Sequence, residues 1–120
     1  MNPKNISHPI DLRPVPGYKG YEASADGRVW RRTATGRLVP VGRIPTGSRL
    51  VSVVGGERVA IEKLVARAFL PPEPGKPYVL FRDGNRYYTA ARNLYRASLE
   101  EVRQRPAFWA RLVDMGHAEE

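Results

Sequence analysis

Short runs of alternating apolar and polar residues dominate the first half of the chain, and turn residues separate them. This pattern predicts three β-strands, over Tyr21–Ser24, Arg28–Arg31 and Arg37–Val41. Gly27 and Gly36 lie between these runs, where glycine permits the positive φ of a tight turn. Residues 14–17 and 42–48 are rich in proline or glycine, so we expect a turn-rich segment and a loop there.

The centre of the chain has a hairpin pattern followed by a change of period. Two β-rich runs, Arg49–Val54 and Glu57–Ala60, flank a Gly-Gly pair and predict a β-hairpin. From residue 61 the spacing becomes helical, which predicts a helix over 61–70 with one apolar stripe: Ile61, Leu64, Val65, Ala68 and Phe69. We expect the opposite face to carry charged side chains, namely Glu62, Lys63 and Arg67. Pro71 ends the helix because proline has no backbone N–H to donate.

The pattern weakens beyond this helix. Residues 71–77, PPEPGKP, predict a rigid surface loop, and Tyr78–Phe81 predicts a further strand. Residues 82–85 predict a turn. Residues 86–97 are basic and aromatic, and we expect a short helix near Ala90–Leu94.

The C-terminal residues predict helices. Ser98 and Glu101 have the spacing of a capping box, which marks the start of a helix. Pro106 either kinks this helix or begins a second one. An apolar face would come from Phe108, Trp109, Leu112 and Val113. Together the elements predict an α+β fold in one compact domain, with a strand-rich N-terminal half, a ββα centre and a helical C-terminal cap.

The charge of the chain indicates a class of partner. It has 120 residues, with 20 Lys+Arg against 12 Asp+Glu and a formal net charge of +8. Most of the basic residues are arginines, whose planar guanidinium matches phosphate and stacks on aromatic rings. The excess lies in residues 1–97, whereas residues 98–120 are net acidic. A pI near 10.3 favours nucleic acid as a partner over a basic soluble protein without one.

Composition also excludes several kinds of chemistry. There is no cysteine, which excludes disulfide scaffolds and cysteine-ligated zinc. The two histidines, His8 and His117, lie near the two ends, so histidine-based catalysis or metal binding has almost no candidates. No apolar run approaches the roughly 20 residues of a membrane span. We therefore predict no cofactor, no metal and no membrane contact, and, without an apolar signal core near residue 1, a cytoplasmic location.

Residues 13–32, RPVPGYKGYEASADGRVWRR, contain a distinctive set of residues at fixed spacing: Pro14, Gly17, Tyr18, Gly20, Tyr21, Ser24, Gly27, Arg28 and Val29. The segment resembles the nuclease-associated modular motif that precedes the catalytic unit in many phage and intron HNH homing endonucleases. The resemblance implies a β-rich accessory module over 13–48 that contacts DNA or serves as a docking module. Residues 1–12 are expected to form a flexible N-terminus, since the first ten have little apolar content.

A second segment, residues 61–95, resembles the catalytic unit of the same family. The matching residues are Leu64-Val65-Ala66, Ala68-Phe69-Leu70, Pro71, Pro77, Val79, Asp83-Gly84-Asn85 and Asn93-Leu94. The resemblance covers about residues 13–97 and implies an HNH-like ββα unit over 49–97, followed by C-terminal helices over 98–120 that lie outside it. In the family, one histidine activates water, and other His and Asn side chains hold a divalent metal.

The departures from the family pattern fall on the catalytic positions. Glu62 and Phe81 occupy the positions of the two histidines, and Tyr88 and Thr89 occupy those of the paired asparagines. Metal-assisted phosphodiester cleavage needs a base with a near-neutral pKa and suitable metal ligands. Phe81 supplies neither. We therefore predict no catalytic residues, although a rebuilt metal site that uses Glu62 and Asp83 stays open as a weaker alternative.

The resulting hypothesis is a non-catalytic nucleic-acid-binding protein of phage or mobile-element type, with DNA as the expected partner. The candidate contact residues are Arg28, Arg31, Arg32, Lys63, Arg67, Arg82, Arg86, Tyr87, Arg92 and Arg96. Trp30 is either a stacking platform or, as we expect for so small a domain, part of the core. The alternative function is a small phage effector that binds and inhibits a host protein, such as a nuclease, a polymerase or a defence complex.

Overall fold

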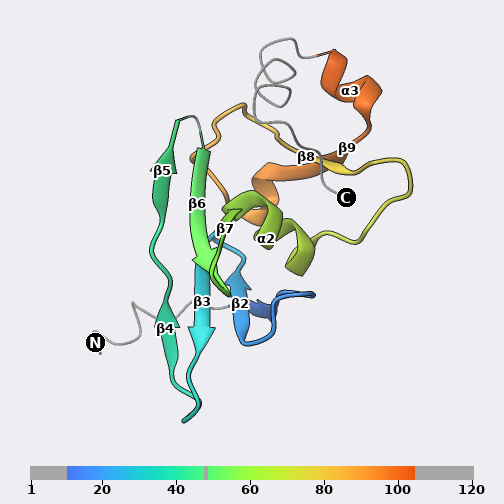
Figure 1. Cartoon of the computed structure of the whole chain (residues 1–120). Helices are drawn as coiled ribbons and strands as arrows, with labels where there is room; N and C mark the ends of the chain where they lie inside the picture. Colours follow the sequence, from blue (N-terminus) through green and yellow to red (C-terminus); the bar gives the residue numbers. More distant parts are fainter. Residues whose placement is uncertain (1–10, 48, 105–120) are drawn as a thin grey trace, which may run out of the picture.

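The structure, a computed structural model, describes residues 11–47 and 49–104. In these ranges the strands form three antiparallel sheets, and helix α2 lies at the centre of the molecule among them (Figure 1). The expected flexible N-terminus up to residue 10 and the expected helical residues beyond 104 lie outside the described residues. The α+β class predicted from the sequence agrees with this mixture of antiparallel strands and helices.

The first sheet has the order β1-β2-β3-β4. Its strands are β1 (Leu12–Pro14), β2 (Tyr21–Ser24), β3 (Val29–Arg32) and β4 (Leu38–Pro40). The prediction of β2 is confirmed, and β3 and β4 each begin one residue later than expected. β1 was not expected, because Pro14 argues against a strand. Pro14 is tolerated because β1 is an edge strand, where a missing N–H leaves no neighbour unpaired.

The second sheet has the order β5-β6-β7, with β5 (Ile44–Thr46), β6 (Arg49–Val54) and β7 (Glu57–Ala60). The hairpin of β6 and β7 is confirmed, and its turn uses glycines at φ +58° and +84°. The expectation of a loop over 42–48 is wrong for Ile44–Thr46, which pairs with β6. Pro45 lies in this strand for the same reason as Pro14, because β5 is an edge strand.

Helix α2 (Ile61–Phe69) follows β7 directly and ends one residue before the predicted end. The first part of its apolar stripe is buried, with Ile61, Leu64 and Val65 fully inaccessible, whereas Ala68 and Phe69 are partly buried and pack against the core. The expected charged face is only partly correct. Lys63 and Arg67 are partly exposed, but Glu62 is buried because the second sheet supplies an ionic partner for it.

The third sheet follows the proline-rich loop and pairs β8 (Tyr78–Phe81) with β9 (Leu94–Ala97). The helix expected near 90–94 is a 3₁₀ turn, η1 (Ala91–Asn93), and β9 follows it at once. The capping box is confirmed at the start of α3 (Leu99–Arg103). Ser98 Oγ accepts a 3.2 Å bond from the Glu101 N–H, and Glu101 Oε1 accepts a 2.8 Å bond from the Ser98 N–H.

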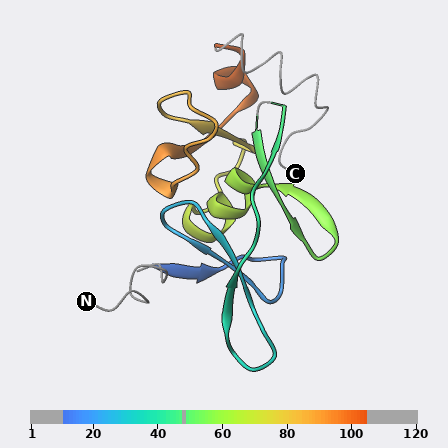
Figure 2. The same ribbon diagram turned by 90° about the vertical axis from the view of Figure 1, so that its left-hand side faces the viewer.

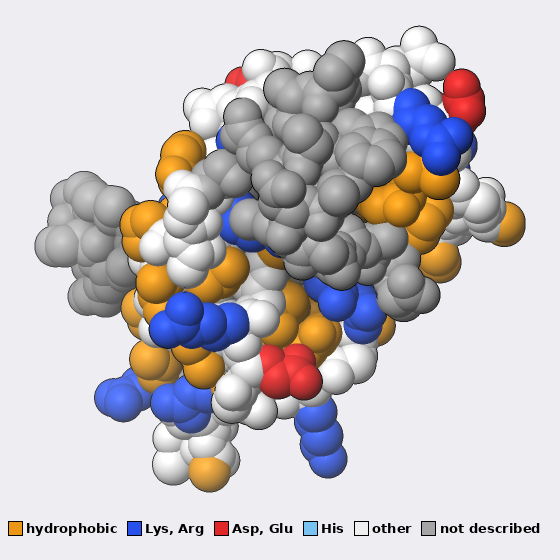
Figure 3. All heavy atoms as spheres, turned by 45° about the horizontal axis from the view of Figure 1, so that its top comes forward, with side chains coloured by type: hydrophobic (Ala, Val, Ile, Leu, Met, Phe, Trp, Pro, Cys, Tyr) orange, Lys and Arg blue, Asp and Glu red, His pale blue; other side chains and the backbone are white. Residues whose placement is uncertain are grey.

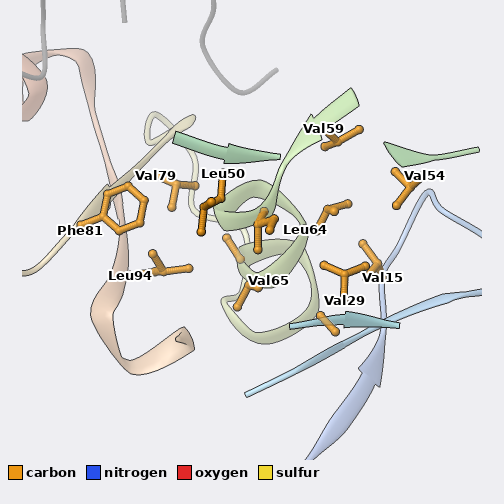
Figure 4. Close-up of a cluster of buried hydrophobic side chains, with 13 residues drawn as sticks. Val15, Val29, Leu50, Val54, Val59, Leu64, Val65, Val79, Phe81 and Leu94 are labelled. Atoms are coloured by element: carbon orange, nitrogen blue, oxygen red, sulfur yellow. The ribbon is translucent and has the colours of Figure 1, made fainter. Parts of the chain in front are cut away.

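One hydrophobic core joins the three sheets through α2. Figure 4 shows Leu64 and Val65 of the helix between two groups of side chains: Val15, Val29, Val54 and Val59 on one side, and Val79, Phe81 and Leu94 on the other. Tyr18 and Tyr21 pack against this cluster. A smaller cluster of Leu80, Ala97 and Val102 packs α3 on the third sheet.

The first sheet also contacts the segment between β8 and β9 directly (Figure 2). Thr89 Oγ1 donates a 2.9 Å hydrogen bond to the Gly27 carbonyl, and the Ala91 N–H donates to the Ala25 carbonyl at 2.9 Å. A Cβ atom at Gly27 would lie 2.6 Å from the Thr89 carbonyl carbon. Position 27, in the turn between β2 and β3, therefore has to be a glycine, because any side chain there would push the turn away from Thr89.

Candidate nucleic-acid interface

The two positions that correspond to histidines in the family pattern are interior positions in this fold. Phe81, at the end of β8, is 2% exposed and belongs to the main core. Glu62, in the first turn of α2, is 3% exposed and forms an ion pair with Arg49 of β6 at 3.1 Å. The Phe81 ring has no group that transfers protons, and the Glu62 carboxylate already faces a cation.

Tyr88 and Thr89, at the positions of the paired asparagines, also make contacts that hold the fold together. Thr89 is buried and bonded to Gly27, as described above. Tyr88 is partly buried, and the Arg92 guanidinium lies 5.4 Å from the centre of its ring. Its carbonyl oxygen accepts a 2.9 Å bond from Asn93 Nδ2.

Asp83 and Asn93 close the segment between β8 and β9. Asn93 is buried, and its Nδ2 donates to Asp83 Oδ1 at 3.0 Å while its Oδ1 accepts from the Asp83 N–H at 3.2 Å. The Asn85 N–H also donates to Asp83 Oδ1, at 2.8 Å. The Asn85 N–H and then the Asn93 amide stabilise the ionised carboxylate, so the pKa of Asp83 lies below its ordinary value of 3.8. Asp83 is thus held within its own loop.

The segment of residues 82–92, here named the arginine loop, carries four of the predicted contact residues. Arg82 and Arg92 are exposed, and each guanidinium stacks on a tyrosine, Arg82 at 5.2 Å from the Tyr95 ring. Stacking of this kind uses the face of a guanidinium and leaves its N–H edge for an anion.

Arg86 and Tyr87 lie in the middle of the arginine loop. Arg86 is partly exposed, and Tyr87 is 48% exposed. The Tyr87 hydroxyl donates to the Gly47 carbonyl at 3.1 Å, so it ties the loop to the turn between β5 and β6. The N–H of Tyr87 donates to Asn85 Oδ1 at 3.0 Å. Side-chain hydrogen bonds therefore hold the loop in place, while the aromatic ring of Tyr87 stays exposed.

Two predicted contact residues on the first sheet have acidic partners. Arg28 stacks on Trp30 at 4.9 Å and pairs with Asp26 at 2.7 Å. Burial raises the pKa of Asp26, but the hydrogen bonds from Arg28 and Ser24 outweigh it and hold the pKa below 3.8. Trp30 is 3% exposed and donates to Ser24 Oγ at 3.2 Å, which confirms that it is a core residue.

The other partnered arginine of this sheet is Arg32. Its guanidinium makes a bidentate pair with Glu22 across β2 and β3, at 2.9 and 3.0 Å. The same guanidinium donates to the Gly36 carbonyl at 3.1 Å. Its neighbour Arg31 is exposed on β3. Of the two arginines Arg31 and Arg32, Arg32 is therefore the one that pairs with an acid of the same sheet, and Arg31 is exposed to solvent.

Three further predicted residues lie on or beside α2. Arg67 stacks on Tyr18 at 5.5 Å and donates to the Pro16 carbonyl at 3.4 Å. Arg96, on β9, donates to the carbonyls that end α2, with the shortest bond to Pro71 at 3.0 Å. Lys63 is partly exposed on the helix.

The predicted residues therefore do not form one cluster. The arginine loop, the first sheet and the end of α2 each hold part of the set. Figure 3 shows Lys and Arg side chains at several places on the face that it presents, among hydrophobic side chains and with few acids. Sequence reasoning missed Arg49 as the partner of Glu62, because an arginine at a strand end has no distinguishing pattern.

Two further searches apply to the described residues alone. In residues 11–47 and 49–104, no three His, Cys, Asp or Glu side chains lie close enough together to hold a metal ion. No helix in that part of the chain is long and apolar enough to span a membrane.

Comparisons with known proteins add a relationship of fold. No protein-family model matches the chain, and no curated protein matches it. A solved structure, described as DNA binding and cleavage by the HNH homing endonuclease I-HmuI, superposes with a TM-score of 0.63 at 21% sequence identity. The match covers 89% of this chain and 60% of that chain. The chain thus has an HNH-endonuclease-like fold and spans about three fifths of the length of that enzyme.

Proposed function

We propose that this chain binds nucleic acid, DNA in particular, on an HNH-like fold and leaves the strands intact. The observation that carries the proposal is the place of Phe81. It stands where the family pattern has a catalytic histidine, and its 2% exposure places it in the core instead of an open site. A phage or mobile-element origin belongs to the same proposal.

The environment of the remaining acids supports a binding role over cleavage. Glu62 would have to act as base or metal ligand, yet its carboxylate lies 3.1 Å from the Arg49 guanidinium inside the protein. The carboxylate is thus already engaged by a cation of the fold. Asp83 Oδ1 accepts hydrogen bonds from the Asn85 N–H and from Asn93 Nδ2. The rebuilt metal site therefore finds less support than binding alone.

The arginine loop is the surface that supports the binding role best. It presents Arg82, Arg86 and Arg92 on an ordered frame, beside the exposed ring of Tyr87. Arginines contact phosphates, and aromatic rings stack on unpaired bases. Counterion release then makes the affinity strongly dependent on salt.

Exposed apolar side chains give less support to an effector that binds a host protein. Among the described residues, the large exposed apolar side chains are Ile44, Val53, Tyr87 and Leu99. They lie on β5, β6, the arginine loop and α3, instead of on one element. A protein-binding face is expected to be a contiguous apolar patch of several hundred Å².

The salt dependence of DNA binding tests the proposal. The triple variant Arg82→Ala, Arg86→Ala, Arg92→Ala removes three charges from the arginine loop. Each phosphate contact contributes about 0.9 to the slope of log K against log salt, so the slope should fall by up to about 2.7. Fluorescence anisotropy with a labelled duplex at several salt concentrations measures it.

A matched triple variant separates a local surface from general charge. Arg37, Arg43 and Arg58 are exposed and lie outside the predicted set, so their replacement by Ala changes the net charge equally. The slope of this control should stay close to that of the unaltered protein. Equal slopes for both triple variants would remove the arginine loop from the interface, and no binding at low salt would contradict the proposal itself.

A further inference from the structure

A cavity of about 510 Å³ opens beside the C-terminal end of α2. Three prolines, Pro16, Pro72 and Pro77, form apolar parts of its wall. Three cations, Arg67, Lys76 and Arg96, also line it. Volumes of this size are typical of sites for small molecules.

The two guanidinium groups are fixed by the backbone. Arg96 donates from Nε to the Pro71 carbonyl at 3.0 Å and from Nη2 to the Leu70 and Ala66 carbonyls at 3.3 and 3.4 Å. Its Nη1 carries two further N–H groups. Arg67 donates from Nη1 to the Pro16 carbonyl at 3.4 Å, and Tyr18 supports its plane. Both side chains are pre-organised, so little rotamer entropy is lost when a ligand binds.

Lys76 differs because its ionic contacts are loose. Its Nζ lies 3.7 Å from Glu73 and 3.8 Å from Glu101, beyond hydrogen-bond length in both cases. The ammonium group can therefore turn toward an anion in the cavity at small cost. Of the charged side chains that line the cavity, Glu73 is the one acid, so three cations and one acid leave a lining charge of +2.

We propose that this cavity binds a 5′-nucleotide, with the phosphate on Arg67, Lys76 and Arg96 and the base against the proline rings. A phosphate monoester carries nearly two negative charges at pH 7, which matches the lining charge. A carboxylate would neutralise half of it. Proline rings offer a flat apolar surface for a base, and guanidinium forks match phosphate oxygens.

Two kinds of ligand present the same 5′-phosphate and base to the cavity: a free mononucleotide and the 5′-phosphorylated end of a DNA strand. The second source rests on the proposed function and would give the chain a second contact to DNA besides the arginine loop. The first source is independent of the proposed function.

Gly17 provides a structural link to the cavity. It has φ +89°, and a Cβ atom there would lie 2.9 Å from Arg67 Nη1. A methyl group at this place would displace the guanidinium from the cavity wall. Gly20 has nearly the same φ, +86°, with no atom within 4 Å of the added Cβ. Gly17→Ala should therefore weaken nucleotide binding, whereas Gly20→Ala carries the backbone strain alone.

Isothermal titration calorimetry of the full chain tests the proposal with deoxyadenosine 5′-monophosphate and deoxyadenosine. The monophosphate should bind at least about tenfold more tightly, the effect of one charge-assisted hydrogen bond. Lys76→Gln should weaken its binding about tenfold, and Lys19→Gln, an exposed lysine outside the lining, should leave it unchanged. Equal affinity for both compounds, binding of neither, or tighter binding of a Glu-rich peptide would overturn the proposal.

Two oligonucleotides of one sequence, with a 5′-phosphate or a 5′-hydroxyl, distinguish the sources. Tighter binding of the phosphorylated strand, lost in Lys76→Gln, assigns the site to strand ends. Binding of the mononucleotide without such a difference assigns it to free nucleotides. Failure of every oligonucleotide and duplex to bind, while the mononucleotide binds, would contradict the proposed function and leave this site standing.

Discussion

Two charged side chains share the interior beside α2, and each depends on the other. The side chains of Glu62 and Arg49 are 4% and 13% exposed, and their charged groups are 3.1 Å apart. Loss of one partner removes the close opposite charge from the other, which costs far more than the pair contributes on its own. The pair therefore acts as a positional constraint between β6 and the first turn of the helix.

Replacement of Glu62 by Ala should lower the free energy of unfolding by about 3 kcal/mol, because the Arg49 charge stays buried. Urea denaturation followed by circular dichroism measures the change. Glu57→Ala, an exposed acid on β7, serves as the control and should change stability by less than about 0.5 kcal/mol. The double variant Arg49→Leu, Glu62→Leu should recover most of the loss, and a loss that persists in it would contradict the ion-pair account.

Asp83 makes the stability of the arginine loop dependent on pH. Its pKa is lowered in the folded state, so the folded protein binds this proton less tightly than the unfolded chain does. The stabilisation is complete above the ordinary value of 3.8 and is lost as the pH falls through the folded pKa. Asp83→Asn should therefore be less stable than the unaltered protein at pH 7, and the gap should close toward pH 2. Thermal unfolding across this range measures it, and a gap that stays constant would exclude the carboxylate charge as its cause.

The family resemblance predicted part of the candidate site. It assigned Phe81 and Glu62 to the positions of the two histidines, and an apolar side chain there is the basis for predicting no catalytic residue. Burial of Glu62 was not predictable, because helical periodicity assigned it to the charged face. The interior carboxylate pairs with Arg49 of β6, and this contact is non-local in the sequence.

At the scale of elements, two of the strands that the sequence pattern did not predict are edge strands that contain proline. β1 and β5 contain Pro14 and Pro45, and both lie at the edge of their sheet. Local rules assign such segments to turns or loops, because proline cannot continue the ladder on both sides. β9 was not predicted for another reason. The arginine loop separates it in sequence from its partner β8, so no local pattern indicates the pairing. The central hairpin, α2 and the capping box were predictable because their patterns are local.

The turn between β2 and β3 sets how closely the first sheet approaches the arginine loop. Gly27→Ala should destabilise the protein by about 2 kcal/mol more than Gly36→Ala, the size of an overpacking penalty. Both glycines have similar positive φ, but only the Cβ at position 27 meets backbone atoms, those of Thr89 and Ala90. Differential scanning fluorimetry compares the two variants. Equal losses would show that backbone strain alone accounts for the glycine.

At the scale of the whole molecule, three small sheets share one helix, and the cationic side chains lie on their surfaces. The sequence charge of +8 predicted a polyanionic partner, but not how the arginines are distributed. In the described part of the chain, Arg28 and Arg32 are held by acids of the same sheet, and Arg96 by carbonyls at the end of α2. The arginine loop instead presents Arg82 and Arg92 on tyrosines, which sequence spacing does not reveal. The fold resembles that of an HNH endonuclease. The burial of Glu62 and Phe81, which stand at the two histidine positions of the family pattern, supports the proposed binding without cleavage.

The most direct test of this account is one incubation of the full chain with end-labelled duplex and single-stranded DNA, with and without Mg²⁺ and Mn²⁺. Native gels report binding, and denaturing gels report strand integrity. The account predicts salt-sensitive complexes and intact strands under every metal condition. Metal-dependent cleavage that Glu62→Gln abolishes would contradict it, and would establish a nuclease in which the buried Glu62 acts in catalysis.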